Sequence, residues 1–247
     1  MSAGTDGRGM AELAALLADG TRAGICVALL DGRAWTAGEL ARRAGVAPST
    51  ASDHLTRLVR GGLLVEERQG RHRYLRLAGP SVAQLIEDLA GHAPTPPAPT
   101  TSLRAARATA ALAYARTCYD HLAGRLGVLM YDALLAAGRL DRSSGLALTR
   151  DGWAWVTELG VPVDVLRAAR RPVVRDCLDW TERRSHLAGA LGAALRHQFS
   201  ELGWITPGAG RAVRLTPMGR AALAESLGVP VSTLIPGTPS PPSSGRA

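Results

Sequence analysis

Four side chains in the C-terminal half of the sequence are of the types that bind soft metal ions. They are Cys118, His121, Cys177 and His186. Two thiolates and two imidazoles could form a tetrahedral zinc site or a soft-metal sensor, and the two cysteines could instead form a thiol redox switch. If both segments are helical, Cys118 and His121 share a face, whereas Cys177 and His186, nine residues apart, lie on opposite faces. This spacing favours the plainer alternative of buried cysteines and hydrogen-bonded core histidines. Zinc or another thiolate-bound metal remains open, and no cofactor is firmly implied.

The segments that carry these residues repeat one pattern. Four blocks recur in the same order, and the step from His121 to Thr149 is 28 residues where that from His186 to Thr216 is 30. The matched blocks are CYD at 118–120 and CLD at 177–179, HLAGRLG at 121–127 and HLAGALG at 186–192, LTRDG at 148–152 and LTPMG at 215–219, and LGVPV at 159–163 and 227–231. The pattern indicates a duplicated module. We expect each copy to form a long helix, a β-hairpin and a closing helix, a winged-helix-like half, with equivalent residues meeting near a pseudo-twofold axis.

The second copy contains an inserted polar segment, residues 180–185. Together with the preceding residues it supplies Asp179, Trp180 and Arg183, an aromatic plane beside charges that could orient an organic effector. The alternative is a salt-bridged helix end with Trp180 as a core plug. We therefore take these three residues, with the four Cys and His residues above, as effector candidates.

Residues 36–77 suggest a different chemistry. Thr36 and Glu39 form the sequence pattern of a capping box, and Gly45 has the backbone freedom that a sharp turn after a first helix needs. Pro48 suits the first position of a second helix, which we expect to span residues 48–60. A β-hairpin should follow, with an arginine-rich tip at residues 68–73. This order is that of a helix for the DNA major groove followed by a basic wing.

The exposed face of the second helix and the wing supply the predicted DNA contacts. Like charges crowded on a hairpin tip repel one another, so we expect phosphates to neutralise them. The residues predicted to meet bases or nearby phosphates are Ser49, Thr50, Ser52 and His54, and those predicted to grip the backbone are Arg57, Arg60, Arg68, Arg71 and Arg73.

Residues 10–92 resemble the winged-helix repressors of the ArsR type. The similarity rests on LADGTR at 17–22, GELA at 38–41, STASDHL at 49–55 and RQGRHRY at 68–74. The resemblance implies a homodimer that binds an imperfect palindrome in double-stranded DNA, usually as a repressor released by an effector. Many members of this family sense metals through cysteines on the first helix of the helix-turn-helix pair, or through acid and histidine ligands on the helix after the wing. Here residues 36–44 contain no cysteine, and residues 80–92 offer only Glu87, Asp88 and His92. The family's usual metal sites therefore do not carry over. A stripe at Val82, Leu85, Ile86 and Leu89 suits either a dimer interface or packing within the monomer.

Composition bounds the remaining possibilities. The chain has 247 residues, a net charge of +8 and 29 basic residues, all arginine. The charge suits a polyanion, the three cysteines suit a reducing compartment, and we find neither a signal pattern nor a membrane-spanning apolar run. No enzyme motif is present, so we expect a cytoplasmic transcriptional regulator and not an enzyme. Its unidentified effector would be a small molecule, a metal or a redox signal.

We predict a mainly α fold with small β-hairpins (α+β). The expected parts are a winged helix-turn-helix domain at 1–92, a proline-rich linker at 93–101, repeats at 102–165 and 166–235, and a disordered tail at 236–247.

Overall fold

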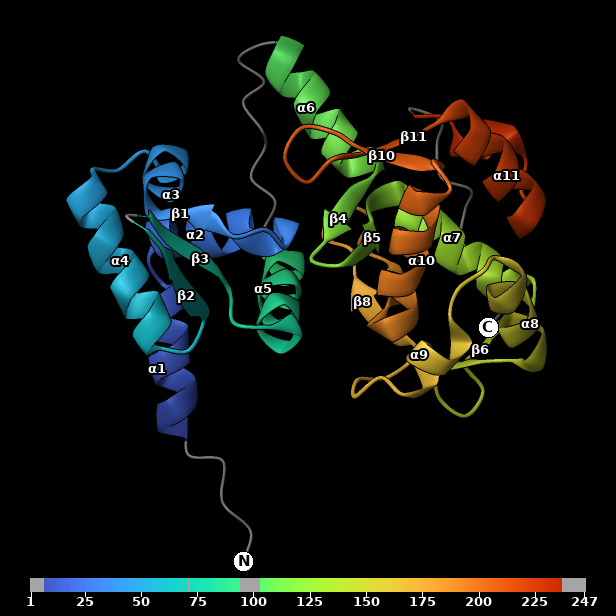
Figure 1. Cartoon of the computed structure of the whole chain (residues 1–247), viewed down its shortest axis with the longest axis horizontal. Helices are drawn as coiled ribbons and strands as arrows, with labels where there is room; N and C mark the ends of the chain where they lie inside the picture. Colours follow the sequence, from blue (N-terminus) through green and yellow to red (C-terminus); the bar gives the residue numbers. More distant parts are fainter. Residues whose placement is uncertain (1–6, 71, 94–102, 237–247) are drawn as a thin grey trace, which may run out of the picture. The chain divides into compact units, whose positions relative to one another are not determined.

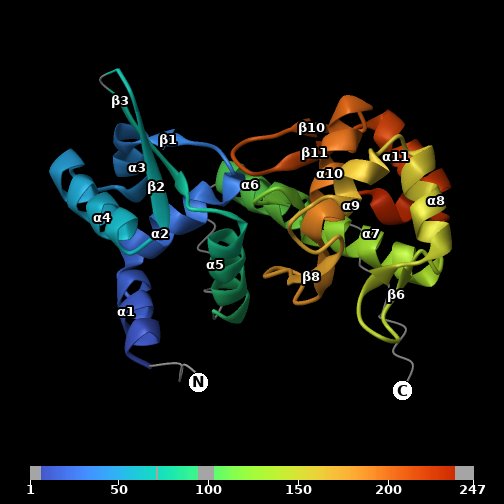
Figure 2. The ribbon, with the colours of Figure 1, turned by 60° about the horizontal axis from the view of Figure 1, so that its bottom comes forward.

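The computed structural model describes residues 7–70, 72–93 and 103–236. The chain divides into two compact units, Met1–Glu87 and Asp88–Ala247, which are described separately. Both are mainly helical with short antiparallel hairpins, as the sequence predicts (Figures 1 and 2). The predicted linker and tail lie almost entirely outside the described residues, and the predicted domain boundaries remain predictions.

The N-terminal unit packs its helices against one three-stranded sheet. The antiparallel strand order is β1-β3-β2, with Leu64 opposite Leu77 and Trp35 opposite Leu75. The elements are α1 Gly7–Leu17, α2 Gly20–Ala28, the 3-10 turn η1 Leu29–Asp31, β1 Trp35–Thr36, α3 Ala37–Ala44, α4 Pro48–Arg60, β2 Leu64–Gln69, β3 His72–Leu77 and α5 Pro80–His92, which crosses the boundary between the units.

Local chemistry fixes the α3–α4 corner as the sequence predicts. The Thr36 hydroxyl accepts from the amide of Glu39, and the Glu39 carboxylate accepts from the amide of Thr36 at 2.8 Å, so the capping box is confirmed. Gly45 ends α3 in the left-handed conformation with φ of 68°, and Pro48 occupies the first turn of α4. The inward faces of the two helices bury Leu40, Leu55 and Leu58.

The junction between α1 and α2 explains the LADGTR motif. The Asp19 carboxylate accepts from the Arg22 amide at 2.9 Å and so caps α2. The Arg22 guanidinium turns back and donates to the carbonyls of Leu16 and Ala15, which are left without helical partners at the end of α1. One acid and one arginine therefore fix the angle between two short helices.

The C-terminal unit contains the same order of elements twice: hairpin, helix, hairpin, helix and a short helical turn. After α6 Leu103–Tyr114, the first segment comprises β4 Arg116–Cys118, β5 His121–Ala123, α7 Gly124–Ala136, β6 Leu140–Asp141, β7 Ala147–Leu148, α8 Arg150–Glu158 and α9 Val163–Arg167. The second comprises β8 Arg175–Leu178, β9 Ser185–Ala188, α10 Gly189–Glu201, β10 Ile205–Pro207, β11 Val213–Leu215, α11 Pro217–Leu227 and the 3-10 turn η2 Val231–Leu234.

The two segments share one core. Buried side chains of α7, α8, α10 and α11 form a single apolar cluster that includes Tyr131, Trp155, Phe199 and Leu223. Strand β5 packs against α10 and β9, whereas β9 packs against α7, so each hairpin contacts the helix of the other segment. Figure 1 shows β5 and β8 beside α10.

Thr149 and Thr216 of the repeated LT blocks cap α8 and α11 by accepting from the amides of Gly152 and Gly219. The prediction that Cys118, His121, Cys177 and His186 lie on helices is wrong. They lie on the hairpins β4–β5 and β8–β9, whose turns contain the left-handed residues Tyr119, with φ of 56°, and Arg183, with φ of 55°.

Among the described residues, no single helix has the length and apolar character needed to cross a membrane. Helices α1 and α2 with η1 meet those criteria only as a pair, bent by 84°.

Candidate DNA interface and candidate metal centre

Helix α4 turns one polar face outward. Ser49, Thr50, Ser52, Arg57 and Arg60 are all exposed on it, while the opposite face is buried in the unit. The hydroxyls lie in the first half of the helix and the guanidinium groups in the second half. The structure therefore brings five of the six predicted α4 contacts onto one surface.

His54 is the exception on this helix. Its Nδ1 lies 3.8 Å from the Asp19 carboxylate, and its side chain is only 16% exposed. The side chain thus packs against the start of α2 and does not lie on the outer face. Its position does not support the predicted contact with bases.

Two arginines of the wing form ion pairs with one acidic residue that sequence reasoning missed. Glu66 on β2 accepts from the Nε of Arg68 at 3.0 Å and from the Nε of Arg73 at 2.7 Å. The bond from Arg73, followed by that from Arg68, holds the pKa of Glu66 below its usual value against the opposing effect of burial. Like charges on the wing are therefore partly neutralised within the protein. Arg68 remains 78% exposed, Arg73 is 20% exposed, and the predicted contact Arg71 lies outside the described residues.

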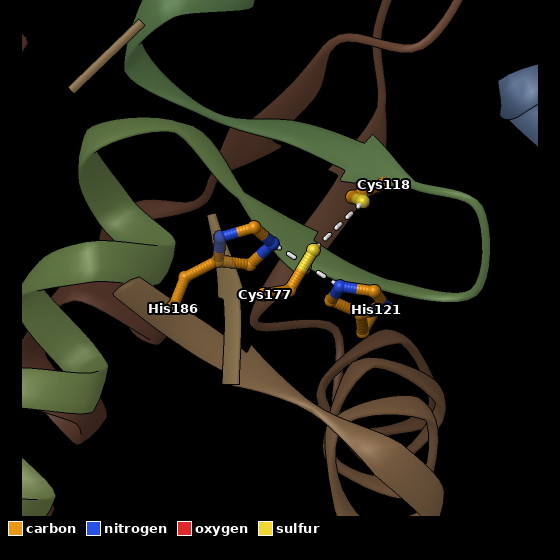
Figure 3. A group of neighbouring side chains, drawn as sticks. All are labelled: Cys118, His121, Cys177 and His186. Carbon is orange, nitrogen blue, oxygen red and sulfur yellow. Dashed lines mark hydrogen bonds between the residues drawn. The ribbon is translucent and has the colours of Figure 1, made fainter. Parts of the chain in front are cut away.

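The four Cys and His side chains of the C-terminal unit meet in one buried cluster (Figure 3). Their ligand atoms all lie within 4.8 Å of one another. The two sulfurs are 3.8 Å apart, and the two Nε2 atoms are 3.1 Å apart. Sequence reasoning separated Cys177 from His186, but they are paired across the β8–β9 hairpin, as Cys118 and His121 are across β4–β5. The six-residue insertion lengthens the turn and leaves that pairing intact.

Small residues make room for this cluster. A Cβ on Gly192 would lie 3.1 Å from the Cβ of His121, and one on Gly127 would lie 3.6 Å from the Cβ of His186. The second glycine of each HLAGxLG block thus accommodates the histidine of the other segment. The first glycines, Gly124 and Gly189, serve another purpose, since both have positive φ and approach the preceding backbone closely.

A carboxylate and an arginine outside the cluster orient one histidine. Asp120 lies 3.1 Å from the Nδ1 of His121 through one oxygen and accepts from Arg171 at 2.6 Å through the other. Burial lowers the pKa of His121, but its bonds to Asp120 and Cys177 outweigh burial and raise it. Sequence reasoning missed Asp120, although it is the third residue of the repeated CYD block.

One cysteine of the cluster is poised as a thiolate. The hydrogen bond from Cys118 is the largest effect on the Cys177 thiol, and with His121 and His186 it outweighs burial and lowers the pKa to about 2. The thiolate, and not the thiol, is the form of cysteine that binds metal ions. By contrast, burial raises the pKa of Cys26 in the N-terminal unit to about 12.

The remaining effector candidates have different surroundings. Asp179 is fully buried, pairs with the guanidinium of Arg116 at 2.8 Å and accepts from the Gly124 amide at 2.6 Å. Burial raises its pKa, but Arg116 and the bonds from the following turn lower it to about 2. The half-buried Trp180 stacks over Arg116 with a centroid distance of 4.6 Å, and Arg183 is exposed in the turn. Asp179 therefore lies in a structural ion pair, which agrees with the salt bridge of the sequence alternative, but the segment is a hairpin turn and not a helix end, and Trp180 is only half-buried and not a core plug.

Helices α3 and α4 with the β2–β3 wing define a winged helix-turn-helix unit. Residues 17–67 match the family model described as a helix-turn-helix domain. Over 225 residues the chain is 41% identical to YdfF of Bacillus subtilis, described as an uncharacterized HTH-type transcriptional regulator, covering 90% of this chain and 98% of the relative. The chain belongs to the family of HTH-type transcriptional regulators, with an N-terminal unit of the ArsR type.

Shorter matches accompany this relative. The HTH-type transcriptional regulator CmtR of Mycobacterium tuberculosis is 40% identical over 80 residues, which cover 32% of this chain and 67% of CmtR. A solved homodimeric winged helix-turn-helix domain of Mb0332 from Mycobacterium bovis, described as a possible ArsR-family regulator, is 31% identical over 36% of this chain and 86% of its own, with a TM-score of 0.32. Reduced HlyU from Vibrio cholerae is 28% identical over 34% of this chain and 87% of its own, with a TM-score of 0.32.

Proposed function

We propose that this regulator is a homodimeric repressor that binds an imperfect palindrome and responds to an effector through its C-terminal unit. The observation that carries the proposal is the exposed polar face of α4 next to a basic wing in a chain of this family. A dimer with two such faces would read two half-sites one helical turn apart on the DNA.

The side chains of this face divide by chemistry. Ser49, Thr50 and Ser52, near the start of α4, are short hydroxyl donors that suit base edges or adjacent phosphates. Arg57, Arg60 and Arg68 carry long cationic side chains that suit the phosphate backbone. The first group would contribute specificity, and the second group would contribute salt-dependent affinity.

An apolar surface on α1 supports the dimer. This helix carries Met10, Leu13 and Leu16 in its sequence, yet none of its residues is buried within the described part of the chain. Met10 is 72% exposed, and Leu89 on α5 is also exposed. A second copy that covered α1 would remove this apolar area from water. The M. bovis domain cited above is described as homodimeric.

The effector role belongs to the C-terminal unit. The B. subtilis relative matches 90% of this chain, which means that it extends through both units. We propose that the two segments of this unit are duplicated, winged-helix-like halves that hold the effector between them. The second candidate function, a metal or thiol-redox receptor whose primary activity lies in this unit, is favoured by the buried Cys and His cluster.

The test is anisotropy binding to the DNA upstream of this protein's own gene, against a scrambled duplex, over a salt series. We expect specific binding tighter by a factor of about 10³ or more and a steep salt dependence. Equal, weak binding to both duplexes would contradict sequence-specific binding of this regulator upstream of its own gene.

Two matched arginine variants distinguish the loss of a specific phosphate contact from a general loss of net positive charge. Arg68→Ala should weaken binding to both duplexes and flatten the salt slope by about one phosphate contact. Arg150→Ala removes the same charge from an exposed position at the start of α8 and should change neither quantity. If the two variants behave alike, the wing does not grip the backbone.

A further inference from the structure

We propose that Cys118, His121, Cys177 and His186 bind one Zn²⁺ ion, or another thiophilic ion that prefers four tetrahedral ligands, and so link the two segments of the C-terminal unit. The inference deepens the second candidate function by naming the ion that this cluster would hold, and it does not depend on whether the chain binds DNA.

The distances between the ligand atoms fit a tetrahedron. With Zn–S bonds of about 2.3 Å, a tetrahedral ion holds its two sulfurs about 3.8 Å apart, and with Zn–N bonds of about 2.0–2.1 Å it holds two nitrogens about 3.3–3.4 Å apart. The structure has 3.8 Å between the sulfurs and 3.1 Å between the Nε2 atoms. Both distances are within a few tenths of an ångström of the tetrahedral values, and the sulfur–nitrogen distances are at most 4.8 Å, so moderate side-chain adjustment would close the site around the ion.

The identity and charge of the ligands select a soft divalent ion. Thiolate and imidazole suit Zn²⁺ and related ions, and they disfavour Mg²⁺ and Ca²⁺, which prefer oxygen. Two thiolates cancel the charge of a divalent ion, so the loaded site is neutral, as a fully buried position requires.

The surroundings fit a closed structural site. The Nδ1 of His121 already lies 3.1 Å from Asp120, which leaves its Nε2 for the ion and supplies the carboxylate that commonly supports a metal-bound histidine. Ala123 and Ala188 complete a small apolar cluster with the two cysteines. Four protein ligands fill the coordination shell, so the site has no open position for a substrate.

The ligands also come in equal pairs from the two segments. Each hairpin supplies one Cys and one His directly opposite each other, and each histidine packs against a glycine of the other segment. An ion at the centre would tie together β4–β5 and β8–β9, which no disulfide joins among the described residues. We therefore expect the metal to stabilise this unit.

The experiment uses the full chain, freed of metal with a chelator under reducing conditions and then titrated with Co²⁺. We expect one Co²⁺ per chain, with the intense visible bands of a tetrahedral ion and thiolate-to-cobalt charge transfer. Added Zn²⁺ should displace the Co²⁺, bleach the bands and raise the Tm. A pale octahedral spectrum, or no binding, would overturn the proposal.

Variants assign the spectrum to this site. Cys177→Ser and His186→Ala should abolish the tetrahedral bands, whereas Cys26→Ala, which removes the third buried cysteine from the other unit, should retain them. Asp120→Asn should keep the bands but weaken metal affinity about 10–100-fold, because Asp120 positions His121. Circular dichroism of each metal-free variant identifies any that fails to fold. Tetrahedral bands that survive in Cys177→Ser would place the metal elsewhere.

The same sulfurs offer a competing outcome. A disulfide needs an S–S distance of about 2.05 Å, so Cys118 and Cys177 would have to approach from 3.8 Å. If freshly purified protein has lost two hydrogens by mass and cannot bind Co²⁺ until it is reduced, a redox pair replaces the metal site. The anisotropy assay measures DNA binding independently of the Co²⁺ titration. A failure of the metal proposal would therefore not contradict the proposed DNA-binding function.

Discussion

At the residue scale, Glu66 offsets part of the positive charge of the wing, which we propose contacts DNA. Its carboxylate binds the guanidinium groups of both Arg68 and Arg73. We expect Glu66→Gln to release both arginines, to tighten binding to any duplex several-fold and to steepen the salt dependence by up to about one phosphate contact. The measurement is anisotropy over a salt series.

A neighbouring acid provides the control for Glu66. Glu67→Gln makes the same change in net charge at an exposed position on the same strand. Its effect on affinity should be clearly smaller, because that carboxylate is in no ion pair with the wing arginines described here. Weaker binding by Glu66→Gln would mean that the carboxylate orients the arginines and does not compete with phosphate.

A second single-residue prediction concerns the buried ion pair of Asp179 and Arg116. Both side chains are fully inaccessible to water. Asp179→Asn would leave Arg116 buried without a counter-ion, and we expect a loss of about 3–5 kcal/mol in the free energy of unfolding. Urea unfolding followed by tryptophan fluorescence measures the loss, since Trp180 stacks on Arg116.

The partly exposed pair of Asp132 and Arg184 serves as the comparison for Asp179. Exposed pairs contribute about 0–1 kcal/mol, so Asp132→Asn should change stability little. Similar, small losses in both variants would show that the buried pair can be replaced without consequence.

At the scale of elements, the capping box at the start of α3 links sequence to stability. Thr36→Ala removes the hydroxyl that caps the helix, and we expect a loss of about 1 kcal/mol. Hydrogen exchange of the amides in 37–44 reports on this helix without interference from the C-terminal unit.

The capping box also predicts a pH dependence. The backbone amide of Thr36 is the largest of the effects that lower the pKa of Glu39. A carboxyl with a depressed folded pKa stabilises the helix above the ordinary glutamate value of about 4.3, and this contribution disappears as the pH falls through the folded pKa. The difference in hydrogen-exchange protection of α3 between the wild type and Glu39→Gln should therefore be largest near neutral pH and should disappear in acid. Glu12→Gln, an exposed change on α1, should not affect α3 at any pH.

The same elements show what the sequence could and could not predict. Helix boundaries at Thr36, Gly45 and Pro48 depend on neighbours within a few residues, and they were predicted correctly. The hairpins that carry Cys118 and Cys177 were not, because a strand of three or four residues has no periodicity to distinguish it from a helix. The turn at Tyr119 also uses a backbone conformation that tyrosine rarely adopts.

For the candidate sites too, features set by local spacing were predicted, and features set by tertiary pairing were not. The outer face of α4 follows from helical spacing alone, so most of its residues were predicted. The Cys and His cluster needed the pairing of two hairpins far apart in the sequence, and Glu66 needed the register that places it beside Arg68 and Arg73. Tertiary pairing decided both, and single-sequence spacing does not contain it.

At the scale of the whole molecule, the exposed apolar residues of α1 predict the oligomeric state. An unpartnered Met10 on a helix with no buried residue is costly in water, and a second copy would cover it. We expect Met10→Glu to shift the chain from dimer to monomer in sedimentation velocity and to weaken binding to a palindromic operator. Binding to a single half-site should remain close to wild type, because α4 and the wing are unchanged.

The matched control is Met218→Glu, which adds the same charge at an exposed methionine on α11 of the C-terminal unit. If α1 forms the interface, Met218→Glu stays dimeric and retains palindrome affinity. A wild-type chain that is monomeric at micromolar concentration and binds half-site and palindrome equally would contradict the dimer. If Met218→Glu alone yields monomers, the C-terminal unit supplies the interface. The exposed face of α1 would then require another explanation.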